Sequence, residues 1–172
     1  VLESNKYLKL NFNGGDLSSD AGLLLIKEFA YKLGFVNILK KEFKTSDSAS
    51  FRFHKDDENL WQVIYQILGA YFEDDCADEL TNDPVLTAIL SKKVLASQPT
   101  LSRFFNRMDE ATLNQFYDLM RRFRKVVYSV KKPEMLLLDL DSTLLNTYGH
   151  QEGEGFNFHY QNRGYHPLVC YD

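Results

Sequence analysis

The sequence predicts an α+β fold in which a mainly helical N-terminal region is followed by a short series of strands. Two observations carry this prediction. Apolar residues recur at helical spacing in several segments up to about residue 130. The pattern then changes at Pro133, after which Met135–Leu140 forms a short, continuous apolar run typical of a buried strand. We therefore expect one domain over residues 1–132 and a second over 133–172.

Local signals mark the ends of several predicted helices. Asp20 and Asp83 can cap helix N-termini, and Pro84 suits the first helical position. Gly34 can end a helix, and Pro99 can begin one. The alternation at the start of the chain instead predicts a strand over residues 7–12. The helices are expected over residues 21–33, 36–43, 59–72, 84–90, from 99 onward, and over 111–130.

The C-terminal region is expected to hold three strands. The first covers residues 135–141, and the second and third cover 156–161 and 165–171. The sequence Asn162-Arg-Gly164 predicts the turn that joins the last two. A hairpin of this kind predicts antiparallel pairing.

Composition narrows the function classes. The chain has 172 residues, of which 44% are hydrophobic and 26% charged, as in globular rather than disordered proteins. No apolar run is long enough to span a bilayer, and no signal peptide opens the chain. Two cysteines far apart indicate a reducing compartment. The first residue, Val1, suggests that the sequence is part of a longer protein.

Charge is unevenly distributed along the chain. The net charge is −4, but residues 92–133 hold ten of the 20 Lys and Arg residues and only three acids. A local basic field can attract a polyanion even when the whole chain is acidic. A solvated basic helix face is the simpler explanation, and charge alone does not decide between them.

Two segments of this basic region carry the predicted DNA contacts. Around the helix that Pro99 begins, short polar and Arg side chains resemble the reading positions of a helix-turn-helix, with Leu101, Phe104 and Phe105 toward the core. The long helix over 111–130 has apolar residues on one face and cations on the other. The candidate DNA-binding residues are Gln98, Thr100, Ser102, Arg103, Arg107, Arg121, Arg122, Arg124 and Lys125.

The sequence Leu136-Leu-Leu-Asp-Leu-Asp-Ser-Thr143 is the strongest catalytic signal. Asp139 and Asp141 lie two residues apart on a predicted strand, so both carboxylates point to the same face. Paired hard oxygen ligands suit Mg²⁺ or Mn²⁺. Two such ions can activate a nucleophile and stabilise a leaving oxygen in phosphoryl transfer.

Two enzyme classes fit this motif. Haloacid-dehalogenase-like phosphatases carry D-x-D-x-T after an apolar strand, with Asp139 as nucleophile and Asp141 as general acid/base. The residues after Thr143 contain no Lys and no acidic pair to complete such a site, and they resemble a hairpin rather than a helical crossover. The other class is a transposase with a DDE catalytic triad.

Further motifs resemble bacterial insertion-sequence transposases with a group 1 DDE domain. They are Tyr148-Gly-His-Gln-Glu-Gly153, Asn162-Arg-Gly-Tyr-His-Pro-Leu168, Ala96-Ser-Gln-Pro-Thr-Leu-Ser-Arg-Phe104 and the segment that begins Ala21-Gly-Leu-Leu. The resemblance implies a ribonuclease-H-like catalytic domain that begins near residue 133. It also implies that Asp141 is the first acid of the triad and Asp139 an accessory metal ligand.

The resemblance also implies cofactors and partners. They are two Mg²⁺ or Mn²⁺ ions, double-stranded DNA from transposon ends and target, and further copies of the chain in a homo-oligomer. The expected location is the bacterial cytoplasm, at the nucleoid. The second acid and the Glu of the triad have no counterpart here, and Asp172 is not interpreted as the second acid. We therefore expect this chain alone to be inactive. A DNA-binding fragment without catalysis remains the alternative.

Overall fold

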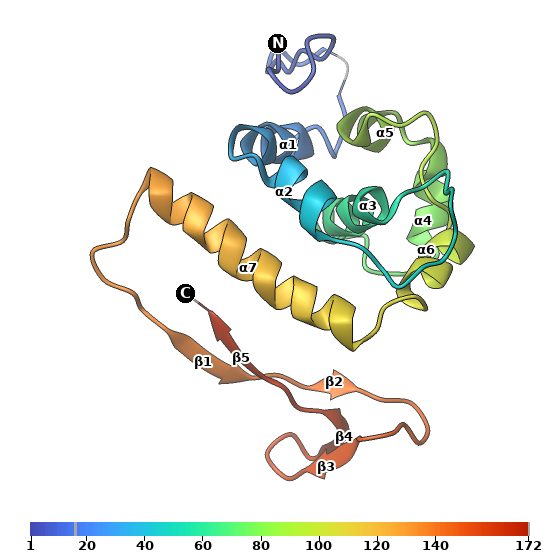
Figure 1. The fold of residues 1–172 in the computed structure, drawn as a ribbon, viewed down its shortest axis with the longest axis vertical. Coiled ribbons are helices and arrows are strands. Elements are labelled where there is room, and N and C mark those ends of the chain that lie inside the picture. The colour runs from blue at the N-terminus through green and yellow to red at the C-terminus, as the bar shows by residue number, and fades with distance from the viewer. Residues whose placement is uncertain (16, 172) are drawn as a thin grey trace. The chain divides into compact units, whose positions relative to one another are not determined.

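The computed structural model describes residues 1–15 and 17–171 and has the predicted α+β composition. The chain divides into two compact units, Val1–Val130 and Lys131–Asp172. We call them the helical unit and the strand unit and describe each by itself. Figure 1 shows helices throughout the first and strands in the second. No helix in the described part of the chain combines the length and hydropathy that a membrane span requires.

The helical unit follows the predicted order of helices, with one short addition. A single turn of α-helix and a 3₁₀ turn precede α5, in a stretch where the sequence has no clear periodicity. The elements are α1 (Leu23–Lys32), α2 (Phe35–Glu42), α3 (Asp56–Leu68), α4 (Cys76–Glu79), η1 (Leu80–Asn82), α5 (Pro84–Leu90), α6 (Gln98–Phe105) and α7 (Glu110–Val130).

Local chemistry explains where several helices begin and end. The Asp83 carboxylate accepts hydrogen bonds from the backbone N–H groups of Val85 and Leu86, which caps α5 as predicted. Gly34 adopts a positive φ of 73° between α1 and α2, so the glycine ends α1 as expected. At the start of α3, the Glu58 carboxylate accepts from the Lys55 backbone N–H at 3.0 Å.

Two expectations near the N-terminus are wrong. Residues 7–12 form no strand with any segment that the structure describes; Leu8 accepts a hydrogen bond from the Leu2 N–H, and Leu8 and Leu10 pack onto the helical core. Asp20 does not cap α1, whose N-cap residue is Gly22. The Asp20 carboxylate accepts a hydrogen bond from the Tyr71 hydroxyl at 2.9 Å. The Asp20 carboxylate thus binds a residue distant in the sequence and does not cap the helix that follows it.

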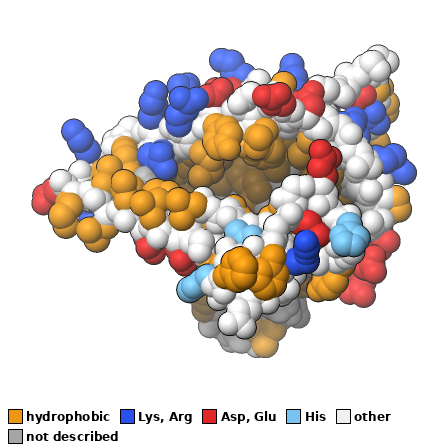
Figure 2. Space-filling view, turned by 90° about the horizontal axis from the view of Figure 1, so that it is seen from below, with side chains coloured by type: hydrophobic (Ala, Val, Ile, Leu, Met, Phe, Trp, Pro, Cys, Tyr) orange, Lys and Arg blue, Asp and Glu red, His pale blue; other side chains and the backbone are white. Residues whose placement is uncertain are grey.

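Helix α3 organises the core of the helical unit. Tyr65, Leu60 and Val63 from this one helix each contribute to a different hydrophobic cluster, and α3 contacts α2, α5 and α6. Figure 1 shows α3 among these helices. Many large hydrophobic side chains nevertheless remain exposed, and Figure 2 shows a number of them in orange on the face that it draws.

The strand unit contains two small antiparallel sheets. In one, β1 (Asp139–Ser142) pairs with β5 (Leu168–Tyr171), with Asp141 opposite Val169. In the other, β4 (Asn162–Tyr165) lies between β2 (Leu145–Asn146) and β3 (Gly155–Asn157). All strand pairs are antiparallel, as predicted, but the predicted strands are not neighbours in a single sheet, because β1 pairs with β5 in one sheet and β3 pairs with β4 in the other. A haloacid-dehalogenase-like phosphatase would instead need its first strand in a parallel sheet followed by a helix.

The strand boundaries differ from the prediction. The structure adds the short strand β2, and the predicted strand over residues 165–171 is interrupted at residues 166–167. Met135–Leu138 is not part of β1, although it is apolar, because only the residues from Asp139 onward find a partner in β5. The chain reverses direction over residues 158–161, where Gln161 takes a positive φ of 53°, and not at Asn162–Gly164. The glycine of the expected turn lies inside β4, paired with Asn146 and Gly155.

Candidate nucleic-acid interface and acidic strand

The segment before α6 is held by a buried side chain of α3. The Gln62 amide donates to the Ala96 carbonyl oxygen, and the Ala96 N–H donates back to the Gln62 amide oxygen, both at 2.8 Å. Both residues are buried. The Leu95 N–H also donates to the Thr81 carbonyl oxygen. These contacts fix the point from which α6, the predicted recognition helix, begins.

The buried face of α6 is narrower than predicted. Leu101 and Phe104 are buried, as expected, but Phe105 is 45% exposed. Residues three apart share a helix face, whereas Phe105 lies about 100° further round from Phe104. The prediction that Phe105 faces the core is therefore wrong.

One flank of α6 is basic. Thr100, Arg103 and Arg107 line a cavity of about 270 Å³ together with residues of the loop before α3. Arg103 is exposed and reaches the Thr100 hydroxyl at 3.4 Å. These three predicted DNA-binding residues are thus brought together by the structure.

The other flank of α6 is apolar and acidic. Gln98 and Ser102 line a separate cavity of about 360 Å³, whose walls include Glu73 and Asp74. The Gln98 backbone N–H donates to the carboxylate of Asp78 at 2.8 Å. The predicted recognition residues therefore divide between two flanks of opposite character, and the acids beside Gln98 would repel a phosphate.

Arg107 is part of a polar network inside the helical unit. Its guanidinium pairs with Asp56 at 2.9 Å and with Asp47 at 3.4 Å, and it donates to the Thr45 hydroxyl. The Arg107 side chain is only 15% exposed. Asp47 also accepts a hydrogen bond from Arg52. The network anchors the loop between α2 and α3 to the end of α6.

The network also sets the protonation of its acids. Burial alone would raise the pKa of the Asp56 carboxyl, but the hydrogen bonds from Thr45 and Arg107 outweigh it and lower the pKa. The hydrogen bond from Arg52, helped by the backbone N–H of Ala49, holds the pKa of Asp47 well below its usual value. Both acids are therefore ionised at neutral pH and neutralise nearby arginines.

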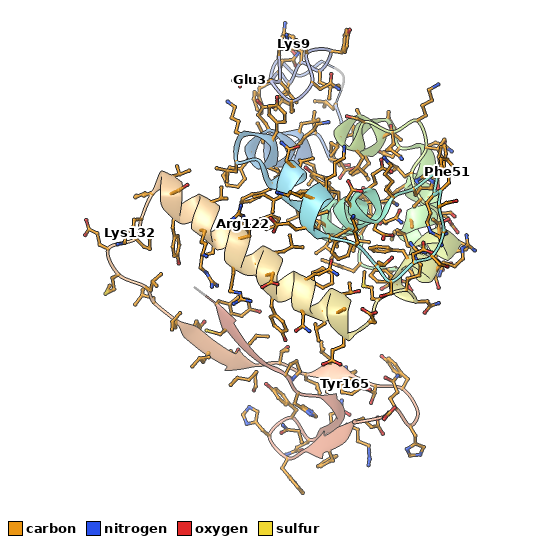
Figure 3. All side chains as sticks on the ribbon, viewed as in Figure 1. Glu3, Lys9, Phe51, Arg122, Lys132 and Tyr165 are labelled. Atoms are coloured by element: carbon orange, nitrogen blue, oxygen red, sulfur yellow. The ribbon has the colours of Figure 1, made fainter. Side chains whose placement is uncertain are left out.

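Helix α7 carries the remaining predicted cations on its exposed surface. Arg121 pairs with Asp118 on the same helix, and Arg122 lies 3.8 Å from Glu42 of α2. Arg122 is labelled on α7 in Figure 3. Arg124 and Lys125 are also exposed. These residues follow one side of the helix within reach of solvent.

Only two of the six residues that the sequence places on the apolar face of α7 pack against the core. Phe116 and Phe123 pack with buried Leu119 against the core, and Phe123 stacks on Phe35 with ring centroids 4.3 Å apart. The other predicted members of that face, however, lie on the helix surface because the apolar stripe is wider than the face that α2 covers. The exposed residues are Leu113, Tyr117, Met120 and Val127.

In the strand unit, β1 presents both predicted metal-binding acids. Asp139 and Asp141 are exposed and lie on the same face of the strand. The Asp141 carboxylate accepts a hydrogen bond from the Ser142 N–H at 2.8 Å. Among residues 1–15 and 17–171, no group of three or more His, Cys, Asp or Glu side chains could together hold a metal ion. The acid pair fits the donor chemistry of Mg²⁺ or Mn²⁺ but supplies only part of a ligand set.

A polar contact supports β1 immediately after Asp141. The Tyr160 hydroxyl donates to the Ser142 carbonyl oxygen at 2.7 Å and lies at the same distance from the Ser142 hydroxyl. The Tyr160 ring stacks on His166 at an interplanar angle of 13°. Sequence reasoning did not identify Tyr160 or His166, because their partners are brought together only by strand pairing.

Sequence reasoning also missed the aromatic loop beside α6. The polar and charged character of residues 45–58 predicts a loop, and within it Phe51-Arg52-Phe53-His54 line the basic cavity. Their alternation of aromatic and basic side chains was the available signal, since this combination is typical of nucleic-acid surfaces.

Comparison with known proteins assigns the family. Residues 2–172 match the family described as transposase DDE domain group 1. Neither a curated protein nor a solved structure matches the chain. Asp172, which sequence reasoning did not interpret as the second triad acid, lies outside the described residues. Because the match covers nearly the whole chain, this protein belongs to the transposase DDE domain group 1 family.

Proposed function

We propose that this chain binds the double-stranded DNA ends of a mobile element and contributes the first acids of a metal-dependent site for DNA cleavage and strand transfer. The observation that carries the proposal is the family match over residues 2–172. In this proposal, residues 1–132 are the DNA-binding region, and residues 133–172 begin a ribonuclease-H-like catalytic domain.

The basic surface supports the DNA-binding part. Ten cations lie within residues 92–133, and Arg103, Arg121, Arg122 and Lys125 are exposed. Exposed cations bind phosphates without reading sequence, and each contact releases counterions. Thr100 and Arg103 on the basic flank of α6 are better placed for DNA than Gln98 and Ser102, which lie beside acids.

The acid pair on β1 supports the catalytic part. Asp141 would be the first acid of the triad and Asp139 an accessory ligand, held at a fixed separation by the pairing with β5. When bound, Mg²⁺ or Mn²⁺ would activate the attacking oxygen and stabilise the leaving one. Tyr160 would position this site through its hydrogen bond to the Ser142 backbone. We also expect copies of the chain to associate, as the simultaneous handling of two DNA ends requires.

DNA binding is tested by removing two cations of α7. The double substitution Arg121→Gln and Arg122→Gln should weaken binding to duplexes of any sequence roughly tenfold at low salt. It should also reduce the slope of log affinity against log salt by about two, one for each cation that no longer neutralises a phosphate. Fluorescence anisotropy with labelled duplexes over a range of salt concentrations measures both quantities.

The control removes two exposed cations outside the basic segment, Lys6→Gln and Lys9→Gln. Figure 3 labels Lys9, in the N-terminal part of the helical unit, and Arg122 on α7. The control should keep the salt slope of the unaltered chain. Equal weakening by both pairs would show that binding is not localised to residues 92–132, and failure of the unaltered chain to bind any duplex would refute the proposal.

A second experiment addresses catalysis. We expect this chain alone not to cut DNA in the presence of Mn²⁺, because a two-metal site requires more carboxylates than Asp139 and Asp141 provide. The measurement is gel analysis of end-labelled duplex DNA incubated with the chain or with Asp141→Ala. Site-specific cleavage that disappears in Asp141→Ala would show that the chain completes the site and that our expectation is wrong.

A further inference from the structure

The basic flank of α6 borders a cavity with aromatic walls. Phe51 and Phe53 line this space of about 270 Å³, and they are 80% and 64% exposed. Two large aromatic side chains that are left in solvent beside arginines are typical of surfaces on which nucleic-acid bases stack. The volume lies just below the roughly 300 Å³ at which pockets for whole small molecules begin, and it therefore suits a single ring system.

The lining of the cavity includes an unpaired buried acceptor. Asn59 is 1% exposed, and its amide oxygen has no hydrogen-bond partner in the described part of the chain. Burial of a polar atom without a partner is unfavourable, so a donor that enters the cavity would be bound preferentially. The exocyclic amino group or ring N–H of a nucleobase is such a donor.

The interior of the cavity is nearly neutral, whereas its rim is positively charged. Arg52 and Arg107 are neutralised by Asp47 and Asp56. Arg103 forms no ion pair with any residue that the structure describes, and its side chain is exposed. Burial, followed by the nearby charge of Lys92, lowers the pKa of His54, so this ring is neutral at pH 7. The nearly neutral interior of the cavity suits an uncharged nucleobase, and Arg103 at its rim suits the phosphate attached to that base.

We infer that this cavity binds one unpaired nucleotide at the end of a DNA duplex. The base stacks on Phe51 or Phe53 and donates to the Asn59 oxygen, while Arg103 contacts the adjoining phosphate. The inference rests on the proposed DNA-binding function and names a substrate feature for it. An unpaired end is favoured over an extruded internal base, because a base that is already unpaired avoids the cost of unstacking.

The test measures the affinity of the full chain for three kinds of DNA end. One is blunt, one carries a single unpaired nucleotide, and the third carries the same extension with its base removed. We expect the intact extension to bind about tenfold more tightly than the blunt end, within the range of one base stacking on an aromatic ring. The abasic extension should bind like the blunt end. Equal affinity for all three ends would overturn the inference but not the proposed function.

A matched pair of variants assigns the effect to the cavity. Phe51→Ala and Phe53→Ala together should remove the preference for the unpaired base. Phe72→Ala alters an aromatic residue whose exposure lies between those of Phe51 and Phe53 and which lines the other cavity of α6, and this variant should keep the preference. A preference that survives Phe51→Ala and Phe53→Ala together would overturn the inference. Failure of the unaltered chain to bind any of the three DNA ends, in contrast, would count against the proposed function itself.

Discussion

Replacement of Gln62 by Leu should destabilise the helical unit by roughly 2–5 kcal/mol, because it leaves the buried N–H and C=O groups of Ala96 without partners. Each unpaired buried polar group costs about 1–3 kcal/mol, and Leu has nearly the volume of Gln but neither donor nor acceptor. Most domains are stable by only about 5–15 kcal/mol, so the loss is a large fraction of the total.

The chain offers a control with the same pair of hydrogen bonds at an exposed position. The Lys44 N–H donates to the Gln115 amide oxygen at 2.8 Å, and the Gln115 amide donates to the Lys44 carbonyl oxygen at 3.0 Å. Water can replace these partners, so Gln115→Leu should cost less than about 1 kcal/mol. Similar losses for the two variants would show that burial does not determine the effect.

Urea unfolding followed by tryptophan fluorescence measures this difference directly. Trp61 is the one tryptophan of the sequence and lies next to Gln62 in α3, so the signal reports on the helical unit alone. Because the Gln62–Ala96 contact also fixes the start of α6, Gln62→Leu should weaken DNA binding under conditions in which the chain remains folded. Gln115→Leu should not.

The elements that could be predicted from the sequence are those whose causes are local. Asp83 caps α5 through the N–H groups two and three residues later, and Gly34 ends α1 through its own φ. Both signals act within one turn of the chain. Asp20 has the same chemistry as Asp83 but binds the distant Tyr71 hydroxyl, so its local signal predicted the wrong cap.

In the candidate site, too, local features could be predicted from the sequence, whereas contacts between distant residues could not. Asp139 and Asp141 could be placed on one strand face from their spacing alone, and Thr100 with Arg103 could be placed on one helix. The pairing of Arg107 with Asp47 and Asp56 could not, since those acids come from a loop and helix far earlier in the chain. The acidic surroundings of Gln98 likewise depend on how α4 and the loop before it fold back toward α6.

Gly164 has a structural role that could not be predicted from the sequence. Its sequence context, Asn162-Arg-Gly164, predicted a turn, but the glycine lies in β4 between β2 and β3. A Cβ atom at this position would lie 2.3 Å from the backbone oxygen of Leu145 and 3.1 Å from a methyl carbon of Leu144. The glycine is therefore required by the close approach of a neighbouring strand and not by a positive φ.

Gly164→Ala should consequently separate β2 from β4 and destabilise the strand unit by about 3 kcal/mol or more, at the upper end of the range for overpacking. The obstacle is backbone, which cannot rotate away as a side chain can. Gly155 is the matched control, since it pairs with Gly164 across β3 and β4, and a Cβ atom added to it would meet no other atom within 4 Å. Gly155→Ala should be neutral or slightly stabilising, because alanine reduces the freedom of the unfolded chain.

Hydrogen exchange of the backbone amides in the full chain distinguishes the two substitutions. In Gly164→Ala, the amides of β2 and β4 should exchange much faster, while those of α3 and α7 keep their protection, because α3 and α7 belong to the other compact unit. The change should be smaller in β1, because β1 pairs with β5 and the Tyr160 hydroxyl donates to the Ser142 carbonyl oxygen. Unchanged protection of the β2 and β4 amides in Gly164→Ala, or equal loss in Gly155→Ala, would refute this explanation of the Asn162-Arg-Gly164 motif.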